Sequence, residues 1–191
     1  MDEMMQRKWK AAALLAITLS INSIYAEAEE DFIFWLFDFA RTKGVKPVTD
    51  KQYQEECSGC HFAYQPGLLP ARSWEVLLTA AALRKHFGVN AELDDATLKV
   101  IHDYAVVNAA DKSWYKRSRK IAVATTDGPT PLRITELRYI SRKHHDIPEK
   151  MVKGNKGVKS LSFCDKCHTQ AAEGVYDVDT VSIPNYPNWD D

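Results

Sequence analysis

All four cysteines of this 191-residue chain lie in two copies of one short motif. The copies are Cys57-Ser-Gly-Cys60-His61 and Cys164-Asp-Lys-Cys167-His168. In a C-x-x-C-H motif the two thiols bind the vinyl groups of one porphyrin, and the adjacent histidine is the proximal ligand of its iron. The sequence therefore predicts two covalently attached c-type haems. The predicted attachment residues are Cys57, Cys60, Cys164 and Cys167, and the predicted proximal iron ligands are His61 and His168.

Other uses of paired cysteines fit the sequence less well. A zinc ribbon needs its two pairs close together, whereas these pairs lie about a hundred residues apart. Thioredoxin-like chemistry would need a βαβ pattern around a pair, and neither pair has one. Two local disulfides are the third alternative, although four cysteines are few for a disulfide-stapled chain of this length.

The N-terminus has the organisation of an export signal. Arg7, Lys8 and Lys10 precede an apolar run at residues 11–21, and an Ala-Glu-Ala site follows at residues 26–28. This order predicts a signal peptide at residues 1–28 that is cleaved on export. The apolar run is shorter than the roughly 20 residues of a membrane-spanning helix, and an uncleaved N-terminal anchor is the alternative. We therefore expect the mature protein in the periplasm.

The charges of the chain nearly cancel, with 25 Lys and Arg against 26 Asp and Glu. Nucleic-acid binders usually have a basic excess, so this balance argues against nucleic acid as a partner. The N-terminal apolar segment, residues 29–48, contains a dense hydrophobic run at residues 32–40. That run is too short to span a bilayer. It predicts packing on the core or, alternatively, contact with a partner or with the membrane surface.

Local patterns predict a mainly α fold. Thr49, Ser73 and Asp94 are candidate helix caps, and the Ser73 helix is expected to continue as far as His86 and Gly88. The Asp94 helix would carry Leu98, Ile101, His102 and Ala105 on one face. We expect further helices at residues 132–145 and 163–172, a turn-rich linker at 125–131 and an extended tail at 183–187.

The second axial ligand decides how each iron behaves. Cleavage of the signal would leave Met151 as the only methionine, so at most one haem can be ligated by histidine and methionine. The histidines outside the motifs are His86, His102, His144 and His145. Two histidine ligands at both irons are therefore the economical interpretation. It predicts low-spin iron with no room for a substrate at the metal.

A longer segment around the first motif resembles a known family. Residues 56–74, with the sequence ECSGCHFAYQPGLLPARSW, resemble the first haem segment of the bacterial periplasmic dihaem cytochromes c. Similar blocks follow in the same order at residues 86–88, 108–110, 131–136, 142–144 and 183–184. The resemblance covers about residues 45–185. It implies two small cytochrome c-like haem domains with short helices and long loops, here at residues 49–124 and 125–191.

The resemblance also implies distal ligands and a function. His86 and His144 occupy the matching distal positions, which leaves His145 and His102 as weaker alternatives. Local pairing would place His86 on the first haem and His144 on the second. The family implies an electron carrier whose partners are a high-spin c-type cytochrome or a membrane b-type cytochrome. The alternative function is a dihaem enzyme, a peroxidase or small-molecule reductase, with one displaceable axial ligand.

Two further sets of cations are of interest. Arg72 and Arg133 are candidates for pairing with haem propionates, because guanidinium binds carboxylate in a bidentate manner. Residues 112–120 contain five cations with Trp114 and Tyr115 between them. Such a run is usually a solvated face, and the functional alternative is a docking surface for an acidic redox partner.

Overall fold

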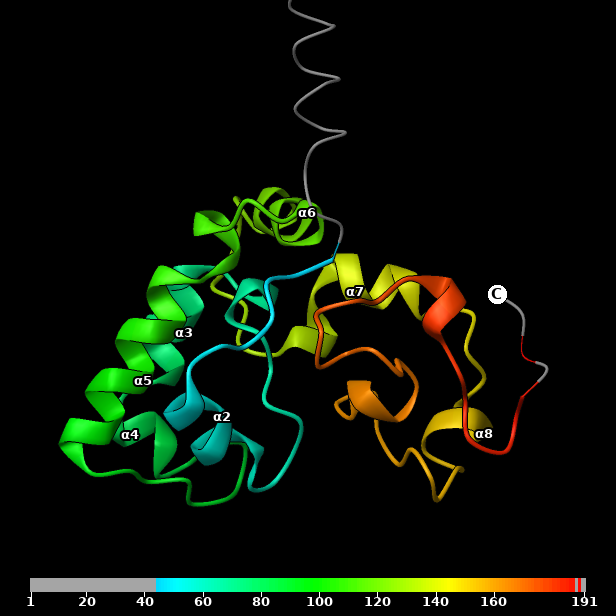
Figure 1. Ribbon diagram of the computed structural model, residues 1–191, viewed down its shortest axis with the longest axis horizontal. Coiled ribbons are helices and arrows are strands. Elements are labelled where there is room, and N and C mark those ends of the chain that lie inside the picture. Colours follow the sequence, from blue (N-terminus) through cyan, green and yellow to red (C-terminus); the bar gives the residue numbers. More distant parts are fainter. Residues whose placement is uncertain (1–43, 188, 190–191) are drawn as a thin grey trace, which may run out of the picture. The chain divides into compact units, whose positions relative to one another are not determined.

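Seven short α-helices and long loops form the part of the chain that the structure describes, residues 44–187 and 189 (Figure 1). The structure is a computed structural model. The predicted signal peptide and the apolar run at 32–40 lie outside the described residues. The helices are α2 (Lys51–Ser58), α3 (Ala71–Leu77), α4 (Ala80–Leu83), α5 (Asp95–Val107), α6 (Lys116–Ala124), α7 (Arg138–Lys143) and α8 (Glu149–Val152).

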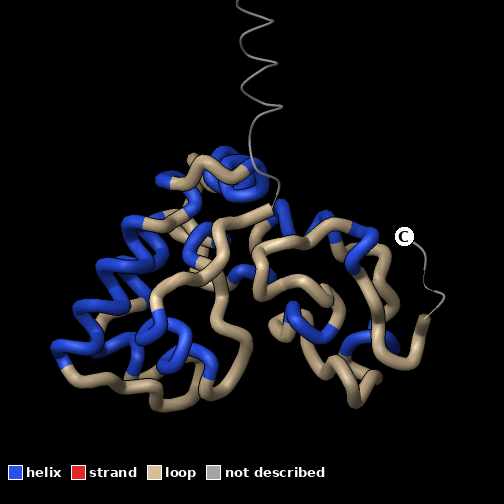
Figure 2. Tube along the Cα trace, viewed as in Figure 1, coloured by secondary structure: helices blue, strands red, loops and turns tan. Residues whose placement is uncertain are grey.

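The mainly α fold class is confirmed. Figure 2 shows only helices and loops among the described residues, and the β pairing found there consists of isolated bridges. Single 3-10 turns lie at Pro66–Leu68, Ala110–Lys112, Ile134–Glu136, Cys164–Lys166 and Val178–Thr180. None of the helices in this part of the chain has the length and apolar character to span a bilayer.

Two hydrophobic clusters hold the described residues together. The larger one lies where α2, α3 and α5 meet and includes the buried residues Tyr53, Trp74 and Ile101. It also takes in Ile134, Leu137 and Tyr139. The smaller cluster consists of Met151, Val152, Val158 and Ile183. Tyr139 of α7 belongs to the larger cluster although it lies beyond the predicted domain boundary after residue 124. That boundary stays a prediction.

The beginning of the described chain pairs with a loop near its end. The Val45 amide donates to the Gly174 carbonyl at 2.9 Å. Gly174 has φ +75°, and a Cβ there would lie 1.9 Å from the Val45 carbonyl oxygen. Only glycine permits this approach, because any side chain would clash with the backbone and disfavour the positive φ.

The first three predicted helices form with partly different ends. Asp50, rather than Thr49, caps α2, and its carboxylate accepts the Tyr53 amide at 2.8 Å. α3 begins before Ser73, which is buried within it, so the predicted Ser73 cap is wrong. The predicted continuous helix is divided because the Thr79 hydroxyl caps α4 separately. The Asp94 cap of α5 is confirmed.

The later predictions were less accurate. α6 was not expected, because its basic sequence buries only Ser118 and Ile121. The helix at 132–145 is reduced to a 3-10 turn and α7, and the one at 163–172 to the 3-10 turn Cys164–Lys166. The tail is not extended: Asn185 has φ +67°, and Ile183 bridges to Tyr186. The predicted linker at 125–131 contains turns and no helix.

Candidate haem sites

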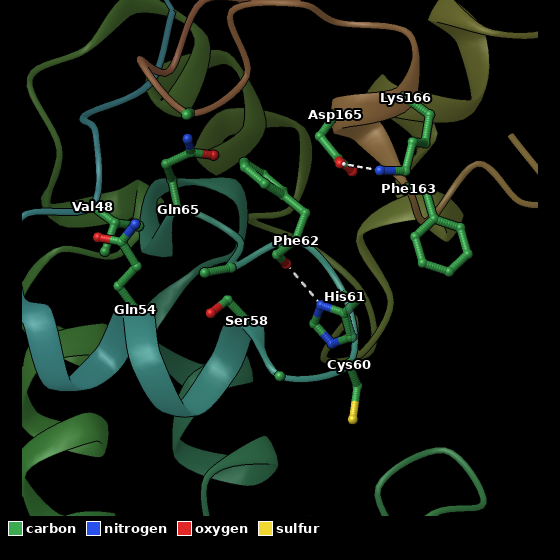
Figure 3. Close-up of a pocket in the computed structure, with 13 residues that line it drawn as sticks. Val48, Gln54, Ser58, Cys60, His61, Phe62, Gln65, Phe163, Asp165 and Lys166 are labelled. Carbon is green, nitrogen blue, oxygen red and sulfur yellow. Dashed lines mark hydrogen bonds and ion pairs between the residues drawn. The ribbon is translucent and has the colours of Figure 1, made fainter. Parts of the chain in front are cut away.

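The first motif begins in the last turn of α2. Cys57 is helical, and the chain leaves the helix at Gly59, just before Cys60 and His61. The His61 Nδ1 atom lies 2.7 Å from the Phe62 carbonyl oxygen (Figure 3). Because a carbonyl only accepts, Nδ1 carries the proton, and Nε2 is left as the nitrogen that can bind a metal.

His86 lies opposite His61. The two ring centroids are 6.4 Å apart and the ring planes differ by 23°. His86 stands in a tight turn after α4 in which Phe87 has φ +50° and Gly88 has φ +101°. A bridge between His86 and Val89 closes the turn. The glycine predicted to end a helix therefore shapes the loop that presents His86 to His61.

The second motif has much less helix around it. Cys164 starts a single 3-10 turn, and its carbonyl accepts the His168 amide at 2.8 Å. His144 ends α7, with Nδ1 2.8 Å from the Ile140 carbonyl. The His144 and His168 ring centroids are 6.0 Å apart, and the planes differ by 80°. The second site thus repeats the histidine pair of the first on a different scaffold.

Burial favours the neutral form of one imidazole in each pair, His168 and His86. Burial, His144 and Arg117 together lower the pKa of His168 to about 4. Burial, then His61 and Arg133, also lower the pKa of His86. Neutral imidazole is the form that ligates a metal. The buried His168 Nδ1 has no hydrogen-bond partner among the described residues.

Two of the four motif thiols lie in surroundings that do not activate them as redox thiols. Burial is the main cause that raises the pKa values of Cys57 and Cys164 to about 12. These shifts favour the protonated thiol, whereas the reactive cysteines of redox dithiols have a lowered pKa. Within residues 44–187 the four cysteines are free, and no group of three or more His, Cys, Asp or Glu side chains is placed to hold a metal ion.

The two motif segments face one another across a cavity of about 400 Å³. Cys60, His61 and Phe62 line it from the first motif, and Phe163 and Asp165 line it from the second (Figure 3). The two attachment segments are far apart in the sequence but neighbours in the fold.

The family follows from comparison with known proteins. The sequence profile of the dihaem cytochrome c family matches residues 53–176. This chain belongs to that family. A diheme cytochrome c from Shewanella baltica OS155 is 38% identical, with TM-score 0.59 over 73% of this chain and 97% of the other. One from Rhodobacter sphaeroides is 43% identical, with TM-score 0.59 over 69% and 100%. Comparison with curated proteins gave no match.

As a dihaem cytochrome c, this protein binds two c-type haems. The residues fit that cofactor, since each motif supplies two thiols and a histidine, and each motif histidine faces a second imidazole. The expected fold, short helices joined by long loops, is also confirmed by the related structures.

The weaker distal alternatives lie elsewhere. The His145 side chain is 65% exposed, with Nε2 3.3 Å from an Asp146 oxygen. His102 lies on α5, where Nδ1 is 3.2 Å from Asp103. Met151 is buried in the smaller hydrophobic cluster. The structure thus brings His86 and His144 to the motif histidines of this cytochrome and directs the other three side chains toward different neighbours.

Three arginines make contacts that the sequence did not predict. Arg72 donates to the Thr125 carbonyl, and Arg133 lies over the Phe87 ring, 4.0 Å from its centroid. Their pairing with propionates stays a prediction. Arg117 was grouped with a solvated run, yet its side chain is only 18% exposed and pairs with Asp177 at 3.3 Å. A predicted helix at α6 would have indicated that Arg117 points inward. The helix could not be predicted, because only Ser118 and Ile121 are buried along it.

Proposed function

We propose that this dihaem cytochrome is a periplasmic electron carrier in which two histidines ligate each iron. The supporting observation is the separation of the paired rings, 6.4 Å for His61 and His86 and 6.0 Å for His144 and His168. A histidine–metal bond is about 2 Å long, and the ring centroid lies about 1 Å beyond the nitrogen, so two imidazoles that held one metal between them would have centroids about 6 Å apart. Both pairs match that separation.

Electron transfer is the chemistry that suits these sites. Each bound haem supplies a one-electron iron couple. The Phe62 and Ile140 carbonyls hold the Nδ1 atoms of His61 and His144, so these rings keep their orientation and protons. Ligands that stay in place in both redox states keep reorganisation small. With His61 and His86 on one iron and His144 and His168 on the other, no coordination position would be left for a substrate.

Absorption and EPR spectra of the purified holoprotein test this function. We expect two low-spin haems in the oxidised protein and no spectral change when carbon monoxide is added to the reduced protein. A high-spin signal, or carbon monoxide binding, would show an accessible iron. The enzyme alternative, a peroxidase or small-molecule reductase, would then replace the carrier.

The periplasmic location rests on the signal-like sequence at residues 1–28. N-terminal sequencing of protein released from the periplasm tests it. A mature chain starting near residue 29 supports cleavage. A chain that retains residues 1–28 and sediments with membranes would support the anchored alternative.

We propose that the partner is an acidic redox protein, such as a high-spin c-type cytochrome. The basic face is defined as Lys112, Lys116, Arg119 and Lys120, which lie on or next to α6. Trp114, 53% exposed, lies among them. Because Arg117 is turned inward, these four cations form the surface that can attract a negatively charged partner.

A further inference from the structure

A fully buried glutamine lies within the first haem segment, four residues after the motif histidine His61. Gln65 has no exposed surface. Its Nε2 atom donates to the Ala171 carbonyl at 2.5 Å, and its Oε1 atom accepts from the Tyr176 hydroxyl at 2.6 Å. A buried amide is costly unless it is hydrogen-bonded. Both partners lie in the segment after the second motif, so Gln65 connects the two halves of the chain.

Tyr176 carries this connection to the second motif. Its ring packs edge-on against the His168 ring, with centroids 5.1 Å apart. The Arg117 guanidinium lies 5.8 Å from the centroid of the Tyr176 ring and donates to the Tyr176 carbonyl at 3.2 Å. Gln65 therefore holds the hydroxyl of Tyr176, and Arg117 contacts both its ring and its backbone. A ring fixed in this way limits how the adjacent imidazole can rotate.

We infer that Gln65 and Tyr176 are positioning residues for His168. Through one hydrogen bond between residues 111 positions apart, the segment that carries the first haem sets the orientation of the proximal imidazole of the second. The inference rests on the proposed ligation of the second haem by His168. It assigns a task to two side chains that lie outside both Cys-x-x-Cys-His motifs.

The neighbouring Tyr64 gives the first site a related contact. Its ring stacks on His61 with centroids 4.7 Å apart, and its hydroxyl donates to the Ser162 carbonyl at 2.5 Å. Adjacent residues thus reach toward both motif histidines. The positioning of His168 nevertheless depends on Gln65 and Tyr176, since these two form the contact that ends on its ring.

Tyr176→Phe and Gln65→Leu test the inference in the holoprotein. Tyr176→Phe keeps the ring and removes only the hydroxyl. We expect each variant to shift the EPR signal and the reduction potential of the second haem and to leave those of the first unchanged. The double variant should shift them no further than the larger single change, because both substitutions remove the same hydrogen bond.

Tyr53→Phe is the matched control. Tyr53 is also buried, and its hydroxyl donates to the Tyr64 carbonyl at 2.8 Å, but its ring packs on Tyr104. It should lower the thermal stability without moving the second EPR signal. Unchanged signals in Tyr176→Phe and Gln65→Leu, or the same shift in Tyr53→Phe, would overturn the positioning role.

The wild-type spectra separate this inference from the proposed function. A second haem that is low-spin in the wild type but insensitive to both variants contradicts the inference alone. A second haem that is high-spin in the wild type contradicts the histidine ligation, and the inference is then rejected with it.

Discussion

The imidazole of His144 stands nearly perpendicular to that of His168, at 80°, with 6.0 Å between the ring centroids. The corresponding rings of His61 and His86 are nearly parallel, at 23°. The cause lies in the backbone: His144 is held at the end of a helix, whereas His86 projects from a turn with two positive φ angles. The same pair of ligands is thus presented in two different orientations.

This difference predicts two distinguishable EPR signals from the oxidised holoprotein. Parallel imidazole planes separate the iron orbital energies and give a rhombic low-spin signal. Perpendicular planes leave those orbitals nearly equal in energy and give a signal with a larger gmax. We expect one signal of each kind, in equal amounts. Two identical rhombic signals would contradict the perpendicular pair.

Replacing the distal histidines one at a time assigns each signal to a site. His86→Ala should abolish the low-spin signal of the first haem and allow it to bind carbon monoxide, because one axial position opens. His144→Ala should do the same at the second haem. His145→Ala and His102→Ala are controls that should leave both signals intact. Loss of a low-spin signal in either control would reassign that distal ligand.

Arg117 is predicted to raise the reduction potential of the second haem. Its guanidinium is largely buried near His168, and a nearby cation favours the reduced, less positive state. Arg117→Gln should therefore lower that potential by roughly 40 mV, equivalent to about 1 kcal/mol for one electron. The negative charge of Asp177, the ion-pair partner of Arg117, offsets part of this effect. Spectroelectrochemical titration measures the change in potential.

Lys120→Gln is the control for this prediction. Lys120 lies on the same helix but is exposed, so solvent screens its charge. It should leave both potentials close to those of the wild type. An equal shift in Arg117→Gln and Lys120→Gln would mean that net charge alone, rather than the buried position, sets the effect.

The contact between Val45 and Gly174 predicts a stability effect. Gly174→Ala should lower the free energy of unfolding by more than about 2 kcal/mol, because it adds both the strain of a positive φ and a clash with backbone. Gly128→Ala is the control, since Gly128 has φ +95° with nothing within 4 Å of its Cβ position. Denaturant unfolding of the holoproteins should rank Gly174→Ala as clearly the more destabilised.

Neutralising the basic face should weaken its long-range attraction for an acidic partner. In a Lys112→Gln, Arg119→Gln and Lys120→Gln triple variant, association with a high-spin c-type cytochrome should slow, and its dependence on salt should flatten. Stopped-flow mixing at several ionic strengths measures both. The charge-matched control replaces the exposed Lys85, Lys150 and Lys156 with Gln. Identical kinetics in the two variants would argue against docking at the basic face.

Sequence patterns predicted the elements of this fold unevenly. The Asp94 cap and the apolar positions Ile101 and Ala105 predicted α5 well, because a capped amphipathic helix is a local pattern. The secondary structure of the second half of the chain could not be predicted from such local patterns. There the chain consists mostly of turns around the motif, and burial of residues such as Val158 and Ile183 comes from distant segments. Helix propensity alone therefore predicted more helix than forms.

The sequence by itself determined the chemistry of attachment: a thiol, a second thiol three residues on and an adjacent histidine form one covalent unit whose spacing needs no tertiary contact. It also reduced the distal candidates to four histidines and Met151. The resemblance favoured His144 over His145, but only the tertiary structure showed which ring faces His168, because the backbone directs the His144 ring to His168 and the His145 ring to Asp146. The tertiary structure alone also revealed the contacts that Tyr176 makes with Gln65 and Arg117. These residues are far apart in the sequence, so no local pattern could have predicted the contacts.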